Sequence, residues 1–134
     1  KHVMNNDILR AFETDMTIDI ITIGAKTGRE RRTEIWFMNI DGRIIICGTP
    51  SASGTPGTYK RRDWLANLKA NPRFTFCLKE SVYAELPARA IEITDHADRR
   101  AIMTAPQTQW YRDQVQSVEE LVNHSPIVEI FFEQ

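Results

Sequence analysis

Residues 24–32, with the sequence GAKTGRERR, carry four cationic side chains and two glycines within nine positions. In a glycine-containing turn, backbone N–H groups can approach a phosphate or carboxylate closely, and Lys and Arg add positive charge. The guanidinium of Arg also grips two oxygens of one anion at once. The pattern favours a site for an anionic ligand, although a basic turn that contacts only solvent has the same composition.

A second basic cluster lies around a predicted helix, whose N-terminal N–H groups also attract anions. With the first cluster it holds nine of the 17 Lys and Arg residues, while the net charge of the chain is −1. The two clusters either converge on one extended polyanion, such as a phosphorylated cofactor tail, or remain solvated loops on different edges. The residues of the second cluster are Lys60, Arg61, Arg62, Lys69 and Arg73.

The sequence has no self-contained catalytic motif. GxSxG, HExxH, Walker A and a GxGxxG that opens a helix are all missing. His2, His96 and His124 are scattered, and Cys47 and Cys77 form no CxxC pair, so we expect no metal site and two free thiols in strands. Any chemistry would therefore depend on a bound cofactor.

The first half of the chain predicts a helix followed by strands. Residues 5–13 suit a helix capped by Asn5 or Asn6, with Ile8, Leu9 and Phe12 on one face. Three β-rich runs follow, and Asp41-Gly42 between the last two is typical of a type I′ hairpin turn. We therefore expect a three-stranded antiparallel meander made of residues 17–24, 33–40 and 43–48.

The second half alternates helices and strands. Residues 49–59 predict a loop, Asp63 a cap for a helix carrying Trp64, Leu65 and Leu68, and Asn71-Pro72 the end of that helix. Pro87 inside the fifth strand predicts an edge or a bulge. The remaining predictions are strands at 73–79 and 82–93, a helix from Thr94 or Asp95 to Met103, partly helical residues 107–123, and a final strand at 127–132 after Pro126.

These elements predict a single domain, residues 1–134, that is mainly β with peripheral helices. Its core is expected to be a six-stranded antiparallel β-barrel, and residues 1–16 form a leading helix and arm. No apolar run reaches the roughly 18 residues of a membrane span, and residues 1–10 lack the apolar core of a signal peptide. A cytoplasmic protein with no integral membrane segment is therefore expected.

Three segments, in order, resemble the deazaflavin-dependent nitroreductase family. They are Gly-x-Lys-Thr-Gly-x-x-Arg at 24–31, a Trp-bearing strand with its Asp-Gly hairpin, and Trp-x-x-Asn-Leu-x-x-Asn-Pro at 64–72, the most specific part. The match covers residues 17–132. The resemblance implies a split β-barrel of the pyridoxamine-phosphate oxidase type and coenzyme F420 as cofactor. FMN is the alternative cofactor, because the wider superfamily includes proteins that use FMN, FAD or haem.

The resemblance also implies a set of cofactor-binding residues. Lys26 and Arg31 would hold the phosphate and acidic tail of the cofactor, while Thr27 and Gly28 would shape the turn. On the helix, the implied residues that bind the same tail or brace that wall are Trp64, Asn67 and Lys69. The chain departs from the family in its long Ser/Gly/Pro-rich loop after Thr49, which would either remodel the mouth of the pocket or mean that the cofactor differs or is absent.

By the same resemblance, we expect an oxidoreductase that transfers a hydride from reduced F420 to a small electron-poor acceptor, such as a quinone, nitroaromatic or activated alkene. Tyr111, beside Trp110, is the candidate proton donor, although the two rings would also serve to pack a helix on the barrel. A homodimer is expected because split barrels often pair across a large interface.

Other functions stay open at this point. One is a non-catalytic flavin- or haem-binding split-barrel module, and another is an FMN-dependent reductase. A third is a basic β-barrel that binds single-stranded nucleic acid. The near-neutral net charge and the lack of an aromatic-rich strand argue against the third, so no nucleic-acid partner is expected.

Overall fold

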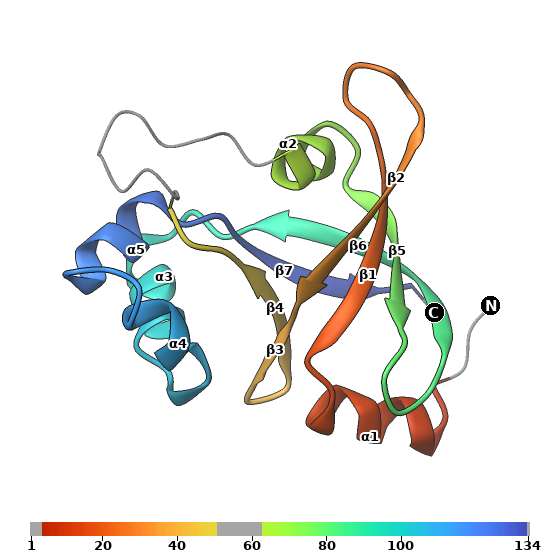
Figure 1. The fold of residues 1–134 in the computed structure, drawn as a ribbon, viewed down its shortest axis with the longest axis horizontal. Helices are drawn as coiled ribbons and strands as arrows, with labels where there is room; N and C mark the ends of the chain where they lie inside the picture. Colours follow the sequence, from red (N-terminus) through yellow and green to blue (C-terminus); the bar gives the residue numbers. More distant parts are fainter. Residues whose placement is uncertain (1–3, 51–62, 134) are drawn as a thin grey trace.

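The computed structural model describes residues 4–50 and 63–133, which form one curled sheet with helices at its ends and along one side (Figure 1). Residues 51–62, including Lys60, Arg61 and Arg62, lie outside the described residues, as does His2. In chain order the elements are α1(Asn6–Thr14), β1(Thr17–Ile23), β2(Glu30–Trp36), β3(Met38–Ile40), β4(Arg43–Cys47), α2(Asp63–Ala70), β5(Arg73–Leu78), β6(Ala84–Glu92), α3(His96–Met103), the 3₁₀ helix η1(Pro106–Thr108), α4(Gln109–Arg112), α5(Val118–His124) and β7(Ile127–Phe132).

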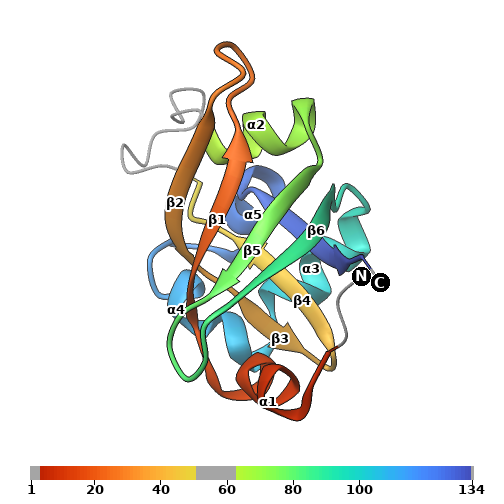
Figure 2. The ribbon, with the colours of Figure 1, turned by 90° about the vertical axis from the view of Figure 1, so that its right-hand side faces the viewer.

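The seven strands form one sheet in the order β2-β1-β5-β6-β7-β4-β3, and every pair is antiparallel. The first and last strands in this order, β2 and β3, are consecutive in the chain. The sheet therefore curls back on itself, with β2, β1, β5 and β6 in front and β4 and β3 behind in Figure 2. The predicted class, mainly β with peripheral helices and an antiparallel barrel, is confirmed.

The prediction of six strands differs from the structure at Phe37. The run predicted at 33–40 divides there into β2, which pairs with β1, and β3, which pairs with β4. The Phe37 N–H donates to the Met16 carbonyl at 2.9 Å, and its ring lies 5.4 Å from that of Phe76 inside the barrel. The expected meander is thus split between the two ends of the sheet, because a buried ring and a long-range hydrogen bond interrupt the strand.

Two turn and strand predictions have opposite outcomes. Asp41 and Gly42 have φ values of 53° and 89°, so both central positions have the positive φ of a type I′ turn, as predicted. Pro87, by contrast, lies in an interior strand whose register with β5 and β7 is unbroken, so neither an edge nor a bulge is present. The Pro87 carbonyl accepts a hydrogen bond from Glu133 N–H at 3.0 Å, and Glu133 lies just past the end of β7. The nitrogen of Pro87 faces the same position. The N–H that proline lacks would therefore lie beyond the end of β7, so no hydrogen bond within the β6–β7 ladder is lost.

Helix α1 covers one end of the barrel (Figure 1). The Asn5 side chain accepts from Ile8 N–H at 2.9 Å, which confirms the predicted cap. Phe12 enters the core and stacks on Phe132 with ring centroids 5.0 Å apart. Leu9 is 48% exposed, contrary to the prediction, because the buried face of the helix consists of Ile8, Ala11 and Phe12.

Helices α3, α4 and α5 form a second core beside the sheet. Its side chains include Ile45, Met103, Leu121 and Ile127. Asp95 caps α3 by accepting from Asp98 N–H at 2.9 Å, as predicted. Residues 107–123 are helical in part, and the final strand has the predicted bounds.

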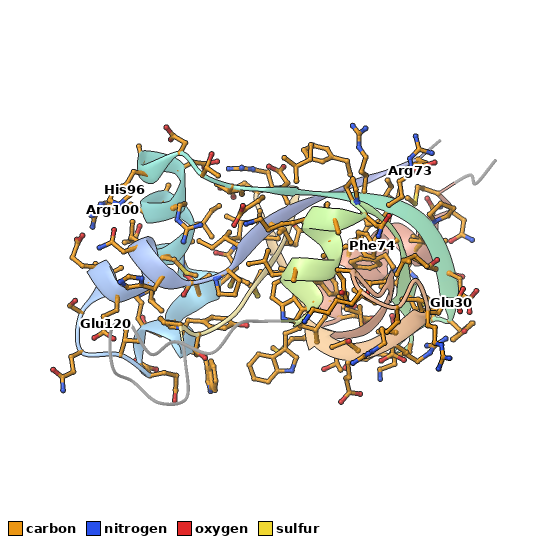
Figure 3. All side chains as sticks on the ribbon, turned by 90° about the horizontal axis from the view of Figure 1, so that it is seen from above. Glu30, Arg73, Phe74, His96, Arg100 and Glu120 are labelled. Atoms are coloured by element: carbon orange, nitrogen blue, oxygen red, sulfur yellow. The ribbon has the colours of Figure 1, made fainter. Side chains whose placement is uncertain are left out.

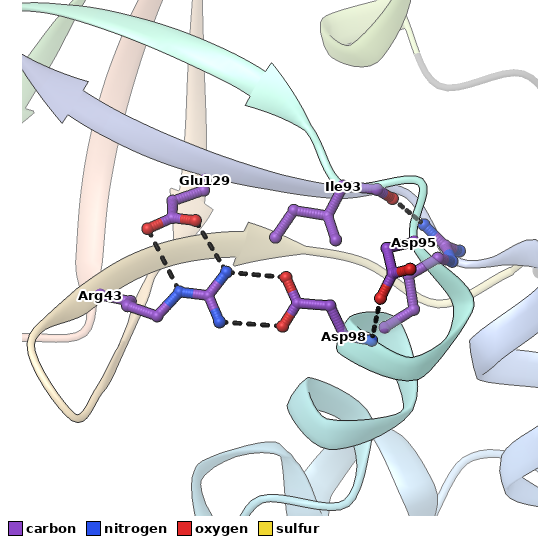
Figure 4. Close-up of polar contacts among 6 residues, drawn as sticks. Arg43, Ile93, Asp95, Asp98 and Glu129 are labelled. Carbon is purple, nitrogen blue, oxygen red and sulfur yellow. Dashed lines mark hydrogen bonds and ion pairs between the residues drawn. The ribbon is translucent and has the colours of Figure 1, made fainter.

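An arginine ties α3 to the sheet (Figure 4). Arg43 on β4 makes two hydrogen bonds of 2.9 Å to Asp98 and bonds of 2.8 and 3.2 Å to Glu129 on β7. The Arg43 hydrogen bonds hold the pKa of Asp98 below its usual value. This clamp fixes the helical region relative to the sheet.

Helix α2 lies at the end of the barrel opposite α1 (Figure 1). It ends before Asn71-Pro72 as predicted, and Leu68 enters the barrel core. Asp63 is the first helical residue and not the residue before the helix, where a capping residue would lie.

Cys47 and Cys77 are free and buried in β4 and β5, as predicted. Within residues 4–50 and 63–133, no helix is both long and apolar enough to span a membrane.

Candidate functional site

The turn between β1 and β2 is held by its own backbone. Gly24 N–H donates to Arg29 O at 2.7 Å, and Gly28 N–H donates to Gly24 O at 2.9 Å. Gly28 has a φ of 71°, which L side chains rarely adopt, and a Cβ on Gly24 would meet Thr27 Oγ1 at 2.7 Å. Thr27 Oγ1 also accepts from Arg29 N–H at 3.2 Å. Both glycines are therefore required by the shape of the turn.

Asn67 joins this turn to α2. Its Oδ1 accepts from Ala25 N–H at 2.9 Å, and its Nδ2 donates to the buried Thr22 Oγ1 at 3.4 Å. Both ends of the carboxamide are thus engaged within the protein. Of the two roles implied for Asn67, bracing the wall is the one its contacts support.

Lys26 and Arg31 line a cavity of about 330 Å³ together with Thr27 and Asn67. Lys26 and Arg31 are exposed, and within the described chain neither side chain has an ion pair or hydrogen bond. Arg32, the next residue, pairs with Asp19 at 2.8 Å. The structure therefore brings four of the predicted cofactor-binding residues together, and two of them carry charges that have no ion pair among the described residues.

A second cavity, of about 420 Å³, has aromatic walls. The rings of Trp36 and Trp110 meet edge to face with centroids 5.2 Å apart, and Trp110 meets Tyr111 in the same way at 5.2 Å. Trp64 from α2 and Thr33 from β2 also line this cavity. Such walls suit a flat, largely apolar ring system.

The two cavities follow one another along the same strand and the same helix. Alternate residues of a strand share a face, so Arg31 in the first cavity and Thr33 in the second lie on one side of β2. Residues three apart on a helix are neighbours, which places Asn67 and Trp64 on one face of α2. We call the two cavities together the β2–α2 groove. It is cationic at the end of the turn and aromatic at the other end.

Tyr111 is buried at the aromatic end of the groove. Its hydroxyl donates to the Cys47 carbonyl at 3.5 Å, a long hydrogen bond. Burial raises the pKa of Tyr111 well above its usual value, so the phenol keeps its proton at neutral pH. Burial also raises the pKa of Cys47 to about 12, which keeps that thiol protonated and unreactive.

Lys69 and Arg73 are not brought into the groove. Lys69 Nζ lies 3.6 Å from Glu92 Oε1, on the other side of α2, and Arg73 pairs with Glu133 at 3.7 Å. Figure 3 shows Arg73 at the barrel end of the molecule, near Phe74. The described members of the second basic cluster thus do not converge with the first, and a cofactor-binding role for Lys69 remains a prediction.

Trp36 and Trp110 are groove residues that the sequence did not indicate as a pair. Trp36 was noted only as part of a strand, and Trp110 only as the neighbour of Tyr111. No local signal in the sequence relates them, because their contact depends on the position of α4 beside the end of β2.

Within residues 4–50 and 63–133, no group of three His, Cys, Asp or Glu side chains is arranged to hold a metal ion.

Solved structures share this fold. A putative pyridoxamine 5'-phosphate oxidase from Listeria innocua has a TM-score of 0.67 at 13% identity, over 95% of this chain and 91% of that one. A conserved hypothetical protein from Mycobacterium tuberculosis has a TM-score of 0.62 at 20% identity, over 98% and 82%. A structure described as an F420 reductase has a TM-score of 0.61 at 13% identity, over 98% and 97%. The chain is therefore a split β-barrel of the pyridoxamine-phosphate oxidase type.

The family is shown by a match that spans most of the chain. The model of the F420H(2)-dependent quinone reductase family matches residues 3–123. The chain belongs to this family, so it is an oxidoreductase and coenzyme F420 is its cofactor. This confirms the resemblance and the prediction of F420 as the cofactor, whereas the individual binding residues remain predictions.

Proposed function

We propose that the protein transfers a hydride from F420H2 to a small electron-poor acceptor, such as a quinone, nitroaromatic or activated alkene. The family description names quinones, so a quinone is the first acceptor to test. The observation that carries the proposal is the β2–α2 groove, where two cations that pair with no other described residue lie at one end and aromatic walls lie at the other. This division suits a cofactor with an anionic tail and a flat ring.

In this proposal the cationic end of the groove binds the phosphate and acidic tail of F420. Lys26 and Arg31 supply charge and hydrogen bonds, and Thr27 and Gly28 keep the turn in shape for them. Asn67 holds the turn against α2 through Ala25. The hydrogen bonds of the turn backbone, Thr27 and Asn67 fix the shape of the turn before binding, whereas the exposed side chains of Lys26 and Arg31 would become ordered on the anion.

The aromatic end of the groove is proposed to receive the ring and the acceptor. F420H2, when bound, supplies the hydride. Trp36, Trp64 and Trp110 would cover the ring and exclude water. Tyr111, whose raised pKa keeps it protonated, would donate a hydrogen bond to an oxygen of the acceptor. A phenol held in that state orients and polarises the acceptor and does not release a free proton.

Two measurements test the proposal on the full chain. Titration with F420 should show saturable binding, and absorbance should show faster oxidation of F420H2 when the protein and menadione, a nitroaromatic or cyclohexenone are present together. A family member with this function should act on at least one of the three acceptors. Binding of F420 with no turnover of any acceptor would leave a carrier and contradict the proposed reaction.

We also propose a homodimer. Ile91 and Phe131 lie diagonally on the outer face of β6 and β7, where they are 48% and 44% exposed, and a partner would cover them. A solved structure with a TM-score of 0.51 and 20% identity is described as a domain-swapped dimer. Sedimentation analysis at several concentrations would decide whether the protein is a monomer or a dimer in solution.

The expected cytoplasmic location stays a prediction.

A further inference from the structure

A third cavity lies beside the aromatic end of the β2–α2 groove, at the end of the barrel that α1 covers. Its volume is about 330 Å³, and its walls come from the end of α1, from residues 36–39 and from η1 and α4. We call it the α1 cavity. Trp36, Trp110 and Tyr111 line both this cavity and the aromatic end of the groove, so the two spaces share one wall.

The three spaces follow β2 and β3 from one end of the barrel to the other. Arg31 lines the cationic end of the groove, Thr33 lines the aromatic end, and residues 36–39 line the α1 cavity. Helix α2 and the turn between β1 and β2 lie at the end of the barrel opposite α1 (Figure 1). A cofactor whose tail is held at Lys26 and Arg31 therefore leaves the α1 side to the acceptor.

The α1 cavity has the opposite charge to the end of the groove that holds the tail. Glu13 and Asp15 line it, and no Lys, Arg or His is among its described lining residues. Within residues 4–50 and 63–133 neither carboxylate has an ion pair, and the exposed Glu13 carboxylate has no hydrogen bond either. Asp15 accepts only from uncharged donors, namely the Thr14 hydroxyl at 3.1 Å and the Ser81 N–H and hydroxyl at 3.1 and 3.0 Å.

The helix itself gains nothing from Glu13. Glu13 lies in the last turn of α1, which has no basic residue, and Asp15 is the residue at its C-terminal cap. The free carbonyls of a helix C-terminus are already partly negative, so carboxylates are disfavoured there. Asp15 is compensated by its bonds to Ser81, but Glu13 makes no such contact. Fold stability therefore does not account for an acid at position 13, whereas a charge that acts on a ligand would.

The rest of the cavity is apolar and partly open. Met16 and Trp110 line it and are 51% and 47% exposed, and the buried Phe12 and Phe37 line it as well. Its volume is at the lower end of the range of small-molecule sites, which suits a substituent of a bound molecule. A cationic substituent would meet tryptophan rings and two carboxylates. An anionic one would meet two like charges and no cation among the described lining residues.

We propose that the α1 cavity receives the substituent of the acceptor that projects away from the F420 ring, and that Glu13 and Asp15 select uncharged and cationic acceptors against anionic ones. This selection rests on the proposed function, because it places the acceptor between the groove and the α1 cavity. The opposite charges at the two ends of the site also orient the cofactor, since its anionic tail is attracted at one end and repelled at the other.

The test uses three 2-methyl-1,4-naphthoquinones that carry at C3 a short alkyl chain ending in a trimethylammonium group, a methyl ester or a carboxylate. Binding to the full chain without F420 is followed by quenching of tryptophan fluorescence, because Trp36 and Trp110 line the cavity. At low ionic strength the Kd of the carboxylate should be about tenfold higher than that of the trimethylammonium compound, with the ester between them. The kcat/KM values with F420H2 should follow the same order.

Variants of Glu13 change the charge of the cavity in steps. Glu13→Gln should reduce the tenfold difference in Kd to about threefold, and Glu13→Lys should remove most of it. Neither should lower the melting temperature, because an acid at the end of α1 opposes the helix dipole. Glu120→Gln and Glu120→Lys are the matched controls and should keep the tenfold difference. Glu120 lies at the helical end of the molecule (Figure 3) and lines neither the groove nor the α1 cavity.

Three results would overturn the charge selection. They are equal Kd values for the three naphthoquinones, no saturable quenching by any of them, and equal effects of the Glu13 and Glu120 variants. Failure of the proposed reaction has a different signature, since the naphthoquinones would then bind in the expected order of charge but none would be reduced by F420H2.

Discussion

Arg31 and Arg32 are neighbours on β2 and meet opposite environments. Arg32 lies on the outer face and pairs with Asp19, which also pairs with Lys79 at 2.8 Å. Lys79 pairs in turn with Glu34. Arg31 lies on the other face, lines the groove and has no ion pair within residues 4–50 and 63–133. The same residue type thus serves the fold on one face and is available to a ligand on the other.

The largest expected effect comes from Arg31→Ala. A charge-assisted hydrogen bond contributes about 1.5–3 kcal/mol, so the Kd for F420 should rise roughly tenfold to a hundredfold, and Lys26→Ala should have a similar effect. Arg32→Ala should change the Kd by less than about twofold, because its charge is directed to Asp19. Titration of the three variants with F420 makes the comparison.

If Arg32→Ala weakened F420 binding as much as Arg31→Ala did, the distinction between the two faces of β2 would fail. Melting temperatures of the same variants are the control. Arg31→Ala should leave the melting temperature unchanged, since that side chain has no ion pair to lose among the described residues.

Tyr111→Phe tests the aromatic end of the groove. Loss of a hydrogen bond to the acceptor should lower kcat/KM for a quinone about tenfold and leave the Kd for F420 unchanged. The fold should tolerate the change, because among residues 4–50 and 63–133 the hydroxyl makes a single long hydrogen bond, of 3.5 Å, to the Cys47 carbonyl. Unchanged turnover would reduce Tyr111 to a packing residue that contacts Trp110.

Trp64→Phe should have a smaller effect on the same surface. A smaller ring covers less of the cofactor, so the Kd for F420 should rise about fivefold while the melting temperature changes little. Both quantities are measured on one sample of the variant. A lower melting temperature with an unchanged Kd would show that Trp64 only packs on the barrel core, which it also contacts.

The smallest effect on the groove is expected from Asp19→Asn on the outer face. Hydrogen bonding to Lys79 holds the pKa of Asp19 below its usual 3.8, so its contribution to stability is present above that pH and is lost as pH falls through the lowered pKa. The melting temperature should fall by about 2–4 °C at neutral pH, and the difference from the parent protein should vanish in strong acid. F420 binding should not change, and a marked loss would connect the two faces.

The parts predicted from sequence are those fixed by local chemistry. The Asn5 cap, the Asp41-Gly42 turn and the strand after Pro126 each depend on a few adjacent residues, and all three have the predicted form. The break at Phe37 was not predictable in this way, because it depends on the distant Met16 carbonyl and on the Phe76 ring.

The residues of the candidate site also fall into those that neighbouring residues predict and those that depend on distant contacts. Lys26 and Thr27 lie in the turn and Arg31 lies at the start of β2 directly after it, so their proximity follows from the sequence. The direction of Lys69 depends on the rotation of α2 and on Glu92, and the contact between Trp36 and Trp110 depends on the packing of α4. Charge density along a sequence cannot show which cations already have partners in the fold.

The carboxamide of Asn67 has a consequence for the choice of residue at that position. A carboxylate of the same size would accept from Ala25 N–H equally well, but it could not donate to Thr22 when ionised. It would also place a resident counterion in the cavity of Lys26 and Arg31 and compete there with any incoming anion. In the proposed site, a neutral side chain at this position therefore avoids a carboxylate that would compete with the anionic tail of F420.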